Sequence, residues 1–348
     1  MSRYQAVRQE LAVSPKTWLV TGAAGFIGSH LIENLLLLGQ KVVGLDNFST
    51  GYRHNYDDVR ERSGPKRWEK FVAISGDISD PEIARESCEN VDYVLHQAAL
   101  GSVPRSLADP IATNQSNVNG FVTMLWAAKE AKVKRFVYAS SSSVYGDQSE
   151  LPKVETRLGN CLSPYAVSKR VNELYADVFA RCYGLSCVGL RYFNVFGPRQ
   201  DPEGAYAAVI PKWIAAMIQD QPIYINGDGQ TSRDFCYVAN VVQANILAAV
   251  GDISGGENML LNIAVGERTT LNELFEVIKA SLTLRLPYLA DLKPIYRAFR
   301  AGDVAHSHAD IDLARKILGY VPSHRIEEGL NDALAWYVDH LQSPVAVR

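Results

Sequence analysis

The sequence predicts an α/β protein built on a doubly wound parallel sheet, with a smaller α/β substrate-binding region. Three observations predict this fold class. Short apolar runs alternate with helical patterns in the first half of the chain. A glycine-rich turn joins the first apolar run to the first helical pattern. Beyond Arg191 the loops become longer and richer in proline and glycine, and we place the substrate-binding region there.

Apolar runs bounded by turn residues mark the expected strands, at 17–20, 41–45, 71–74, 93–95, 135–138 and 187–190. Helical patterns lie between them, at 26–38, 81–89, 118–131 and 165–183. The pattern at 26–38 starts directly after the glycine-rich turn and is closed by Gly39. Because strands that alternate with helices pair in parallel through crossover connections, this order indicates a parallel sheet of the Rossmann type.

The change of texture also suggests how the chain is divided. We expect residues 1–193 to form a dinucleotide-binding domain and residues 194–348 to form the substrate-binding region. Parts of the chain near 235–264 are expected to return to the first domain, because apolar runs resume there. Internal repeats and low-complexity segments are absent from the sequence.

Composition and charge exclude several classes of protein. The chain has 348 residues, 47% of them apolar, and a net charge of −3, so nothing indicates binding to nucleic acid or anionic lipid. Its early apolar stretch, 35–38, is far shorter than the ~20 residues that a membrane span needs. The mixed charges of 1–16 do not indicate a signal peptide. Five cysteines without a C-x-x-C pair indicate reduced thiols, a cytoplasmic location and no metal site.

The glycine-rich turn indicates a dinucleotide site. Its sequence, Thr21 to Gly28, has the spacing G-x-x-G-x-x-G between a strand and a helix. Glycines there allow a tight turn and let the backbone approach a pyrophosphate at the helix N-terminus, although a plain structural turn has the same composition. Asp46 ends the second strand, 18 residues after Gly28. A carboxylate there accepts hydrogen bonds from the adenosine ribose and repels a 2′-phosphate, which favours NAD over NADP despite the nearby Arg53.

Two further strand ends extend the same crevice. Gly76-Asp77-Ile78 follows the third expected strand, where adenine would lie. Gln97-Ala98-Ala99 follows the fourth, and its small residues leave room for the cofactor. Each segment is unremarkable alone, but together they outline one crevice along the carboxyl ends of the strands.

A tyrosine, a lysine and a serine form the candidate catalytic group. Tyr165 and Lys169 are four positions apart in a helical pattern, so they share a face. A tyrosine of pKa ~10 is a poor base at neutral pH, but an ammonium group and a positive nicotinamide ring would favour the phenolate. The serine run 140–143 follows the expected strand 135–138, and a serine there can hydrogen-bond a reacting hydroxyl. Tyrosine–lysine pairs with this spacing also occur by chance on surface helices. The interpretation therefore depends on finding the serine run, the tyrosine and the lysine together in a chain that also has the glycine-rich turn.

These motifs resemble those of the extended short-chain dehydrogenases that act on nucleotide sugars, including UDP-galactose 4-epimerase. The matching motifs span nearly the whole chain: Thr21–Gly28, Asp46-Asn47, Asp77-Ile78, Ser141 with Val144-Tyr145-Gly146, Tyr165 with Lys169, Arg191–Asn194, Ser232–Phe235 and Arg300–Asp303. The loop 98–106 and the run 224–229 are similar to bacterial UDP-N-acetylglucosamine 4-epimerases of surface-polysaccharide pathways.

The resemblance implies a mechanism. Tyr165 takes the proton from the sugar 4-hydroxyl, Ser141 shares the hydrogen bond, and Lys169 holds the nicotinamide ribose and lowers the tyrosine pKa. NAD takes the hydride, the 4-keto sugar turns over, and the hydride returns to its other face. NAD is therefore regenerated and expected to stay tightly bound. The expected cofactor-binding residues are Gly22, Gly25, Phe26, Ile27, Gly28, Asp46, Asn47, Ser49, Thr50, Gly51, Asp77, Ile78, Gln97, Ala98, Ala99, Asn117, Tyr165, Lys169 and Tyr192.

The resemblance also implies a substrate pocket for a UDP-sugar. Its expected residues are Gly101, Ser102, Ser141, Ser142, Ser143, Asn194, Gln200, Ala208, Val209, Tyr224, Asn226, Arg233, Arg300, Asp303 and Ser307. Two arginines among them suit a diphosphate. Ser307 matches a position that carries a bulky tyrosine in strict bacterial UDP-galactose epimerases, and a serine leaves space for a 2-acetamido group. We therefore expect interconversion of UDP-GlcNAc and UDP-GalNAc, with UDP-glucose as an open alternative.

Other reactions and substrates are weighed against this expectation. Similar enzymes carry a basic residue where this chain has Ala305, so UDP-GlcNAc-uronate and UDP-glucuronate stay open. A nucleotide-sugar dehydratase or decarboxylase would need an acid beside the catalytic serine, where this chain has Ser142 and Ser143. A non-catalytic nucleotide sensor is disfavoured because the serine, tyrosine and lysine are all present.

The family resemblance further implies a homodimer. Its members pair through a four-helix bundle, which here would be made by the helical stretches 118–131 and 165–183 of two subunits. The apolar residues of these stretches are equally well explained as core within one chain, as is the case for Phe121, Met124, Leu125 and Val178.

Overall fold

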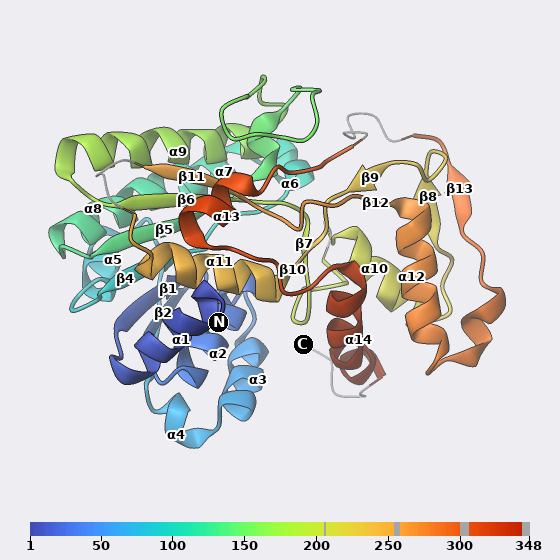
Figure 1. Cartoon of the computed structure of the whole chain (residues 1–348), viewed down its shortest axis with the longest axis horizontal. Helices are drawn as coiled ribbons and strands as arrows, with labels where there is room; N and C mark the ends of the chain where they lie inside the picture. Colours follow the sequence, from blue (N-terminus) through green and yellow to red (C-terminus); the bar gives the residue numbers. More distant parts are fainter. Residues whose placement is uncertain (205–206, 254–257, 300–305, 343–348) are drawn as a thin grey trace.

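A seven-stranded sheet forms the centre of the protein (Figure 1). The computed structural model describes residues 1–204, 207–253, 258–299 and 306–342. All neighbouring strands of the sheet are parallel, in the order β11-β6-β5-β4-β1-β2-β3. The strands are β1 (Thr17–Thr21), β2 (Lys41–Asp46), β3 (Phe71–Ser75), β4 (Tyr93–His96), β5 (Arg135–Ser141), β6 (Cys187–Tyr192) and β11 (Met259–Ile263). The predicted doubly wound fold is confirmed.

Helices cover both faces of the sheet, so the central strands are largely apolar and buried, whereas the edge strand β3 is mostly exposed. One face carries α1 (Arg3–Val13), α2 (Phe26–Leu37), α11 (Val238–Val250) and α13 (Asp312–Leu318). The other carries α5 (Pro81–Ser87), α8 (Phe121–Glu130) and α9 (Pro164–Tyr183). All six residues of β6 are buried between these layers.

The helix expected at 118–131 differs from the observed one. A π-helical segment, Gln115–Gly120, precedes α8, which begins at Phe121. Phe121, Met124 and Leu125 are buried inside the chain, so packing against the sheet accounts for them. Val178 on α9 is 42% exposed, so the core does not account for it.

The amino-terminal helix α1 was not expected from the sequence. Ser2 and Gln5 form a capping box at its start, in which Ser2 Oγ accepts from the Gln5 N–H at 3.2 Å and the Gln5 side chain accepts from the Ser2 N–H at 3.1 Å. Val7 and Leu11 are its buried residues, and they join the core beneath α11. The helix therefore extends the layer on one face of the sheet.

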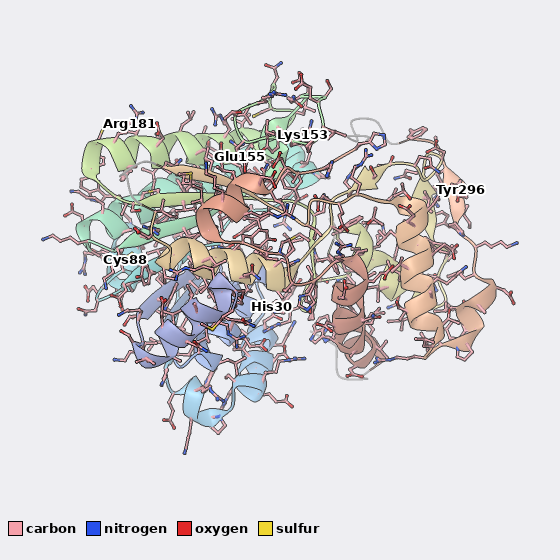
Figure 2. The ribbon with its side chains drawn as sticks, in the orientation of Figure 1. His30, Cys88, Lys153, Glu155, Arg181 and Tyr296 are labelled. Carbon is pink, nitrogen blue, oxygen red and sulfur yellow. The ribbon has the colours of Figure 1, made fainter. Side chains whose placement is uncertain are left out.

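A smaller unit with its own apolar core lies beside the sheet, at the right of Figure 1. It contains three two-stranded sheets: β7 (Val195–Phe196) with β10 (Cys236–Tyr237), β8 (Tyr224–Asn226) with β13 (Ile295–Arg297), and β9 (Ser232–Arg233) with β12 (Thr269–Thr270). Its helices are α10 (Val209–Ile218), α12 (Leu271–Thr283) and α14 (Ile326–Gln342). Figure 2 shows Tyr296 of β13 at the outer edge of this unit.

Short helices complete the fold: α3 (Arg53–Ser63), α4 (Pro65–Trp68), α6 (Val103–Ala108), α7 (Pro110–Asn114) and the 3₁₀ turns Ser142–Tyr145 and Pro287–Asp291. The stretch 235–264 supplies α11 and β11 to the main sheet layer. The domain limits 1–193 and 194–348 stay predictions. Within the described ranges, no helix is both long and apolar enough to cross a membrane.

Candidate active site

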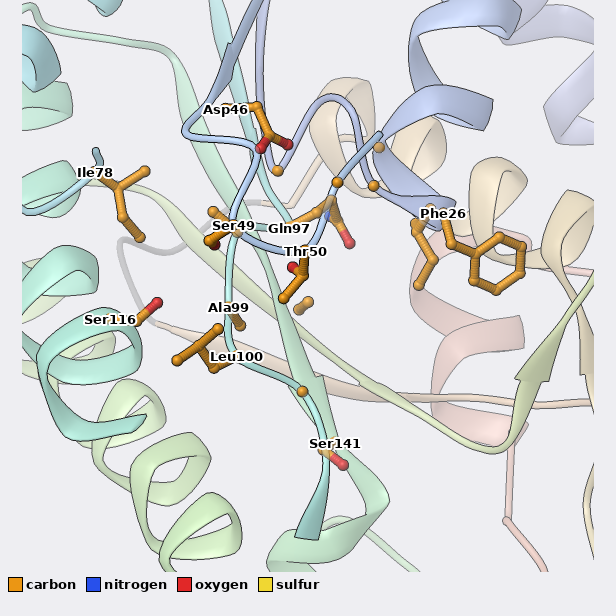
Figure 3. A pocket seen from close by; sticks show the side chains of 18 of the residues that line it. Phe26, Asp46, Ser49, Thr50, Ile78, Gln97, Ala99, Leu100, Ser116 and Ser141 are labelled. Carbon is orange, nitrogen blue, oxygen red and sulfur yellow. The ribbon is translucent and has the colours of Figure 1, made fainter. Parts of the chain in front are cut away.

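A cavity of about 480 Å³ lies at the carboxyl ends of the central strands. It opens beside the neighbouring strands β1 and β4. From β1 the chain continues outward through β2 and β3, and it then crosses back to β4 and continues in the other direction. Ligands usually bind at such a switch point in folds of this type. Figure 3 shows Asp46, Ile78, Gln97 and Ser141 around it, each at or just beyond the end of a strand. We call it the cofactor cavity.

The glycine turn shapes one side of the cofactor cavity. Gly22 has φ +65°, and a Cβ there would lie 2.8 Å from the Ala98 nitrogen. A Cβ on Gly28 would lie 2.0 Å from the Gly22 carbonyl oxygen, so only glycine fits. Gly25 is the N-cap of α2 and provides no side-chain cap, which leaves the first N–H groups of the helix for an anionic ligand. These features fit the pyrophosphate of NAD.

Asp46 holds the turn as well as facing the cavity. Its Oδ2 accepts from the Ala24 N–H at 2.8 Å and its Oδ1 from the Phe48 N–H at 2.7 Å. Burial raises the pKa of Asp46, and the two backbone N–H groups oppose that rise. Each oxygen keeps a lone pair that a ribose hydroxyl can use. The Arg53 guanidinium stacks on the Phe48 ring, 4.2 Å from its centroid.

Nearly all predicted cofactor residues line this cavity. It is lined by Gly22, Gly25, Phe26, Ile27, Gly28, Asp46, Asn47, Ser49, Thr50, Gly51, Ile78, Gln97, Ala98, Ala99, Tyr165, Lys169 and Tyr192. Asp77 and Asn117 are not among the lining residues. Asp77 accepts from Asn47 Nδ2 at 2.7 Å. Asn117 is buried, and its side chain bonds both backbone groups of Leu100. Asp77 and Asn117 thus hold two residues that line the cavity, Asn47 and Leu100.

The candidate catalytic residues come from two elements. Tyr165 and Lys169 lie on α9, whose N-cap Ser163 accepts from the Ala166 N–H at 3.1 Å. Ser141 ends β5 and accepts from the Ser143 N–H at 3.2 Å. Lys169 Nζ donates to the Ala139 carbonyl at 2.8 Å and lies 5.9 Å from the centroid of the Tyr165 ring. The helix thus crosses the end of the strand and brings all three side chains to the cavity.

Burial dominates the titration of this group. It raises the pKa of Tyr165, while a hydrogen bond with Ser141 works in the opposite direction. It lowers the pKa of the Lys169 ammonium to about 8. The role of Lys169 in lowering the tyrosine pKa, which the resemblance implied, stays a prediction.

His96 is a buried support that the sequence did not indicate. Burial lowers its pKa to about 3, so the ring is neutral at physiological pH. Its Nδ1 lies 3.0 Å from Thr21 Oγ1, which in turn accepts from the Ala98 N–H at 3.2 Å. The sequence gives no signal for this contact, because Thr21 and His96 each end an otherwise apolar strand and lie far apart in the chain.

A second cavity, also about 480 Å³, adjoins the first and shares Ser141, Tyr165 and Asn194 with it. We call it the sugar cavity. Six of the predicted substrate residues line it: Ser141, Ser142, Ser143, Asn194, Arg233 and Ser307. It is also lined by residues that the sequence did not single out, namely Val103, Pro104, Leu107, Lys153, Leu162, Ser163 and His306.

The remaining predicted substrate residues lie elsewhere. Gly101 lines the cofactor cavity, and Ser102 caps α6. Ala208 and Val209 begin α10, Gln200 donates to the Val195 carbonyl, and Tyr224 and Asn226 lie on β8. Apart from Gly101, none of the residues just named lines either cavity. Arg300 and Asp303 lie outside the described residues, as does Ala305. The ligand contacts of all these residues stay predictions.

Residues 18–264 match the NAD-dependent epimerase/dehydratase family. The chain belongs to this family. A Methanocaldococcus jannaschii protein named as a putative UDP-glucose 4-epimerase is 36% identical over 320 residues, covering 91% of this chain and 97% of that protein. Family membership agrees with the resemblance carried by the glycine turn and by Tyr165 and Lys169.

Solved structures are similar over more than nine-tenths of the chain. The UDP-N-acetylglucosamine 4-epimerase of Methanobrevibacter ruminantium, in complex with UDP-N-acetylmuramic acid, has a TM-score of 0.85 at 38% identity, covering 93% of this chain and 99% of that one. The UDP-glucuronic acid 4-epimerase of Bacillus cereus, in complex with NAD and a fluorinated UDP-glucuronic acid, has a TM-score of 0.82 at 28% identity, covering 93% and 99%. The predictions of an enzyme of the isomerase class and of NAD as its cofactor are confirmed.

Proposed function

We propose that this family member is a 4-epimerase that interconverts UDP-GlcNAc and UDP-GalNAc through a 4-keto intermediate. The observation that carries the proposal is the meeting of the two cavities at Ser141 and Tyr165. A sugar carbon held there would face the cofactor cavity on one side and the sugar cavity on the other. A similar structure is a UDP-N-acetylglucosamine 4-epimerase, which supports the choice of sugar.

The proposed mechanism assigns each step to a side chain. NAD, when bound, supplies the reversible hydride acceptor at C4. Tyr165 removes the proton of the 4-hydroxyl as its C–H bond breaks, and returns it when the carbonyl is reduced from the other face. Ser141 holds the reacting oxygen in both directions. Lys169 orients the cofactor end of the site through its fixed ammonium group, which the Ala139 carbonyl positions.

Two serines support a 2-acetamido sugar. The hydroxyl oxygen of Ser143 is buried and has no hydrogen-bond partner among the described residues. An unpaired buried hydroxyl is costly, so a ligand group such as an amide is a fitting partner. Ser307 also lines the sugar cavity, with a small side chain. Its backbone N–H donates to the Ser232 carbonyl at 3.0 Å, which fixes its position.

The test is conversion of a sugar without added NAD. Purified protein is incubated with UDP-GlcNAc, UDP-glucose and UDP-GlcNAc-uronate in parallel, and the products are resolved by NMR. We expect UDP-GalNAc from UDP-GlcNAc at the highest rate. Turnover of UDP-glucose alone would refute the acetamido assignment, and no turnover of any sugar with NAD supplied would refute the epimerase.

The size of residue 307 gives a sharper test. We expect Ser307→Tyr to lower kcat/KM for UDP-GlcNAc at least about tenfold relative to UDP-glucose, because a tyrosine fills the space proposed for the acetamido group. Ser307→Ala is the matched control, because it keeps the space and removes only the hydroxyl. An unchanged ratio in the tyrosine variant would contradict the assignment.

Lys153 favours UDP-GlcNAc-uronate as a second candidate. This lysine lines the sugar cavity and is only 6% exposed. Its ammonium donates to the Gln148 carbonyl and side chain, and no ion pair with a carboxylate is found for it in the described residues. Figure 2 shows it beside Glu155, in the loop above the sheet. A 6-carboxylate would supply the missing charge, so preference for the uronate in the NMR assay, lost in Lys153→Met, would support this candidate.

We also propose a cytoplasmic homodimer that pairs through α8 and α9. Large apolar side chains are exposed along these helices: Trp126, Val167, Leu174, Tyr175, Val178 and Tyr183. Such a patch on one face favours an interface. Leu174→Glu is expected to halve the mass measured by light scattering. Leu284→Glu is the control, because Leu284 is also exposed but directly follows α12, away from α8 and α9.

A further inference from the structure

A group of apolar residues, which we call the wall, lines part of the sugar cavity. The wall consists of Val103, Pro104, Leu107 and Leu162. Val103 is 39%, Leu107 63% and Leu162 57% exposed. Exposed apolar side chains that gather around a pocket are favoured when a ligand covers them. Serines, Arg233 and His306 also line the cavity, so its lining is partly polar and partly apolar.

The wall is built rigidly. Ser102 has φ 129°, a strained backbone conformation for a residue with a side chain, and its Oγ accepts from the Arg105 N–H at 3.2 Å at the start of α6. Ser106 Oγ donates to the Val103 carbonyl at 2.8 Å. Pro104 occupies the first turn of the helix. The apolar surface is therefore already formed in the absence of ligand.

The rest of the cavity limits which part of a ligand meets this wall. The reacting carbon lies at Ser141 and Tyr165 under the proposed function, and the diphosphate needs the cationic side at Arg233. A substituent of the sugar ring must then face the apolar wall. The acetamido methyl is the only apolar end group of the proposed substrate, and Ser143, with its unpaired hydroxyl, offers a partner for the amide next to it.

We propose that the wall accepts N-acyl groups longer than acetyl, so that the enzyme acts on UDP-2-acylamido-2-deoxyhexoses as a class. The inference rests on the proposed function. A methyl group covers little of a wall made of three leucine-sized or valine-sized side chains and a proline. Additional methylenes cover more of it and leave the amide and the reacting carbon where they are.

The test compares UDP-GlcNAc with its N-propionyl and N-butyryl analogues. We expect kcat/KM to rise by about two- to fourfold for each added methylene, the upper value corresponding to its full burial. The variant Leu107→Asn keeps the number and branching of the side-chain heavy atoms and is expected to abolish that rise, because it makes the wall polar. Ile111→Asn is the matched control: Ile111 is 81% exposed on the neighbouring α7 and lines neither cavity, so the rise should persist.

The outcomes separate this inference from the proposed function. Turnover of UDP-GlcNAc with a decline in kcat/KM along the acyl series would overturn the inference and leave the proposed function intact. A rise along the series that Leu107→Asn does not affect would also overturn it. Failure of UDP-GlcNAc itself to react would refute the proposed function instead.

Discussion

Glu173 is the centre of a buried ionic network behind the candidate catalytic residues. Its side chain is 1% exposed, and that of its partner Arg191 is 0% exposed. Arg191 donates through Nε at 2.8 Å and Nη2 at 2.9 Å, one bond to each carboxylate oxygen. Ser140 Oγ donates at 2.7 Å and Arg170 Nη1 at 2.8 Å. The network ties α9 to the ends of β5 and β6.

We expect Glu173→Gln to lower the free energy of unfolding by about 3–5 kcal/mol. The amide is isosteric, so packing is kept. Its oxygen can still accept two of the four hydrogen bonds, but its NH₂ group faces the donors of Arg191 and Arg170. Loss of a hydrogen bond to a charged group costs about 1.5–3 kcal/mol, and the bond to the partly exposed Arg170 contributes the smaller share. The guanidinium of Arg191 is then left buried without its counter-charge.

Urea unfolding followed by tryptophan fluorescence and by circular dichroism measures the change. The matched control is Glu89→Gln, which breaks the Arg85–Glu89 pair on α5 and its following turn, where the side chains are 68% and 55% exposed. We expect a loss below about 1 kcal/mol there. If Glu173→Gln cost no more than the control, the reasoning on buried charge would be refuted.

Three further predictions concern single residues. Gly28→Ala should abolish NAD binding by calorimetry, because its Cβ would overlap the Gly22 carbonyl; retained affinity would contradict this. Asp46→Asn should weaken NAD binding about tenfold and reduce the preference of the enzyme for NAD over NADP, since the carboxylate charge is lost; both affinities are measured by calorimetry. Burial raises the pKa of Asp234 from 3.8 to about 6, so native stability relative to Asp234→Asn should fall by about 2 kcal/mol from pH 4 to pH 7; a constant difference in urea unfolding would refute this.

The main sheet could be predicted because its strands are buried on both faces. Continuous apolar runs such as 187–190 have no other good explanation between helical patterns, and the structure places that run in a fully buried strand. The position of the cofactor cavity could also be predicted, because the carboxyl ends of parallel strands lie at one edge of the sheet. Asp46 and Gln97 are distant in sequence but lie at that edge together (Figure 3).

Contacts that depend on surface shape could not be predicted in this way. Leu107 and Leu162 are exposed, and an exposed leucine has no distinctive pattern in sequence. They become meaningful only because the fold brings them to one cavity. The helix α1 had a usable signal in its capping box, Ser2 with Gln5, but the mixed charges that follow hide its short apolar stripe. Local capping was thus a better guide there than periodicity.

The electrostatics of Tyr165 show how the site can avoid unproductive proton transfer. Burial raises the tyrosine pKa, and the Ser141 hydroxyl only partly opposes the rise. Lys169 stands 5.9 Å from the ring centroid, and its own pKa is lowered by the same burial. The chain alone therefore keeps Tyr165 protonated at neutral pH. Under the proposed mechanism, the positive charge of an oxidised nicotinamide ring would favour deprotonation of Tyr165 when the cofactor can accept a hydride. Removal of the proton would thereby be coupled to removal of the hydride.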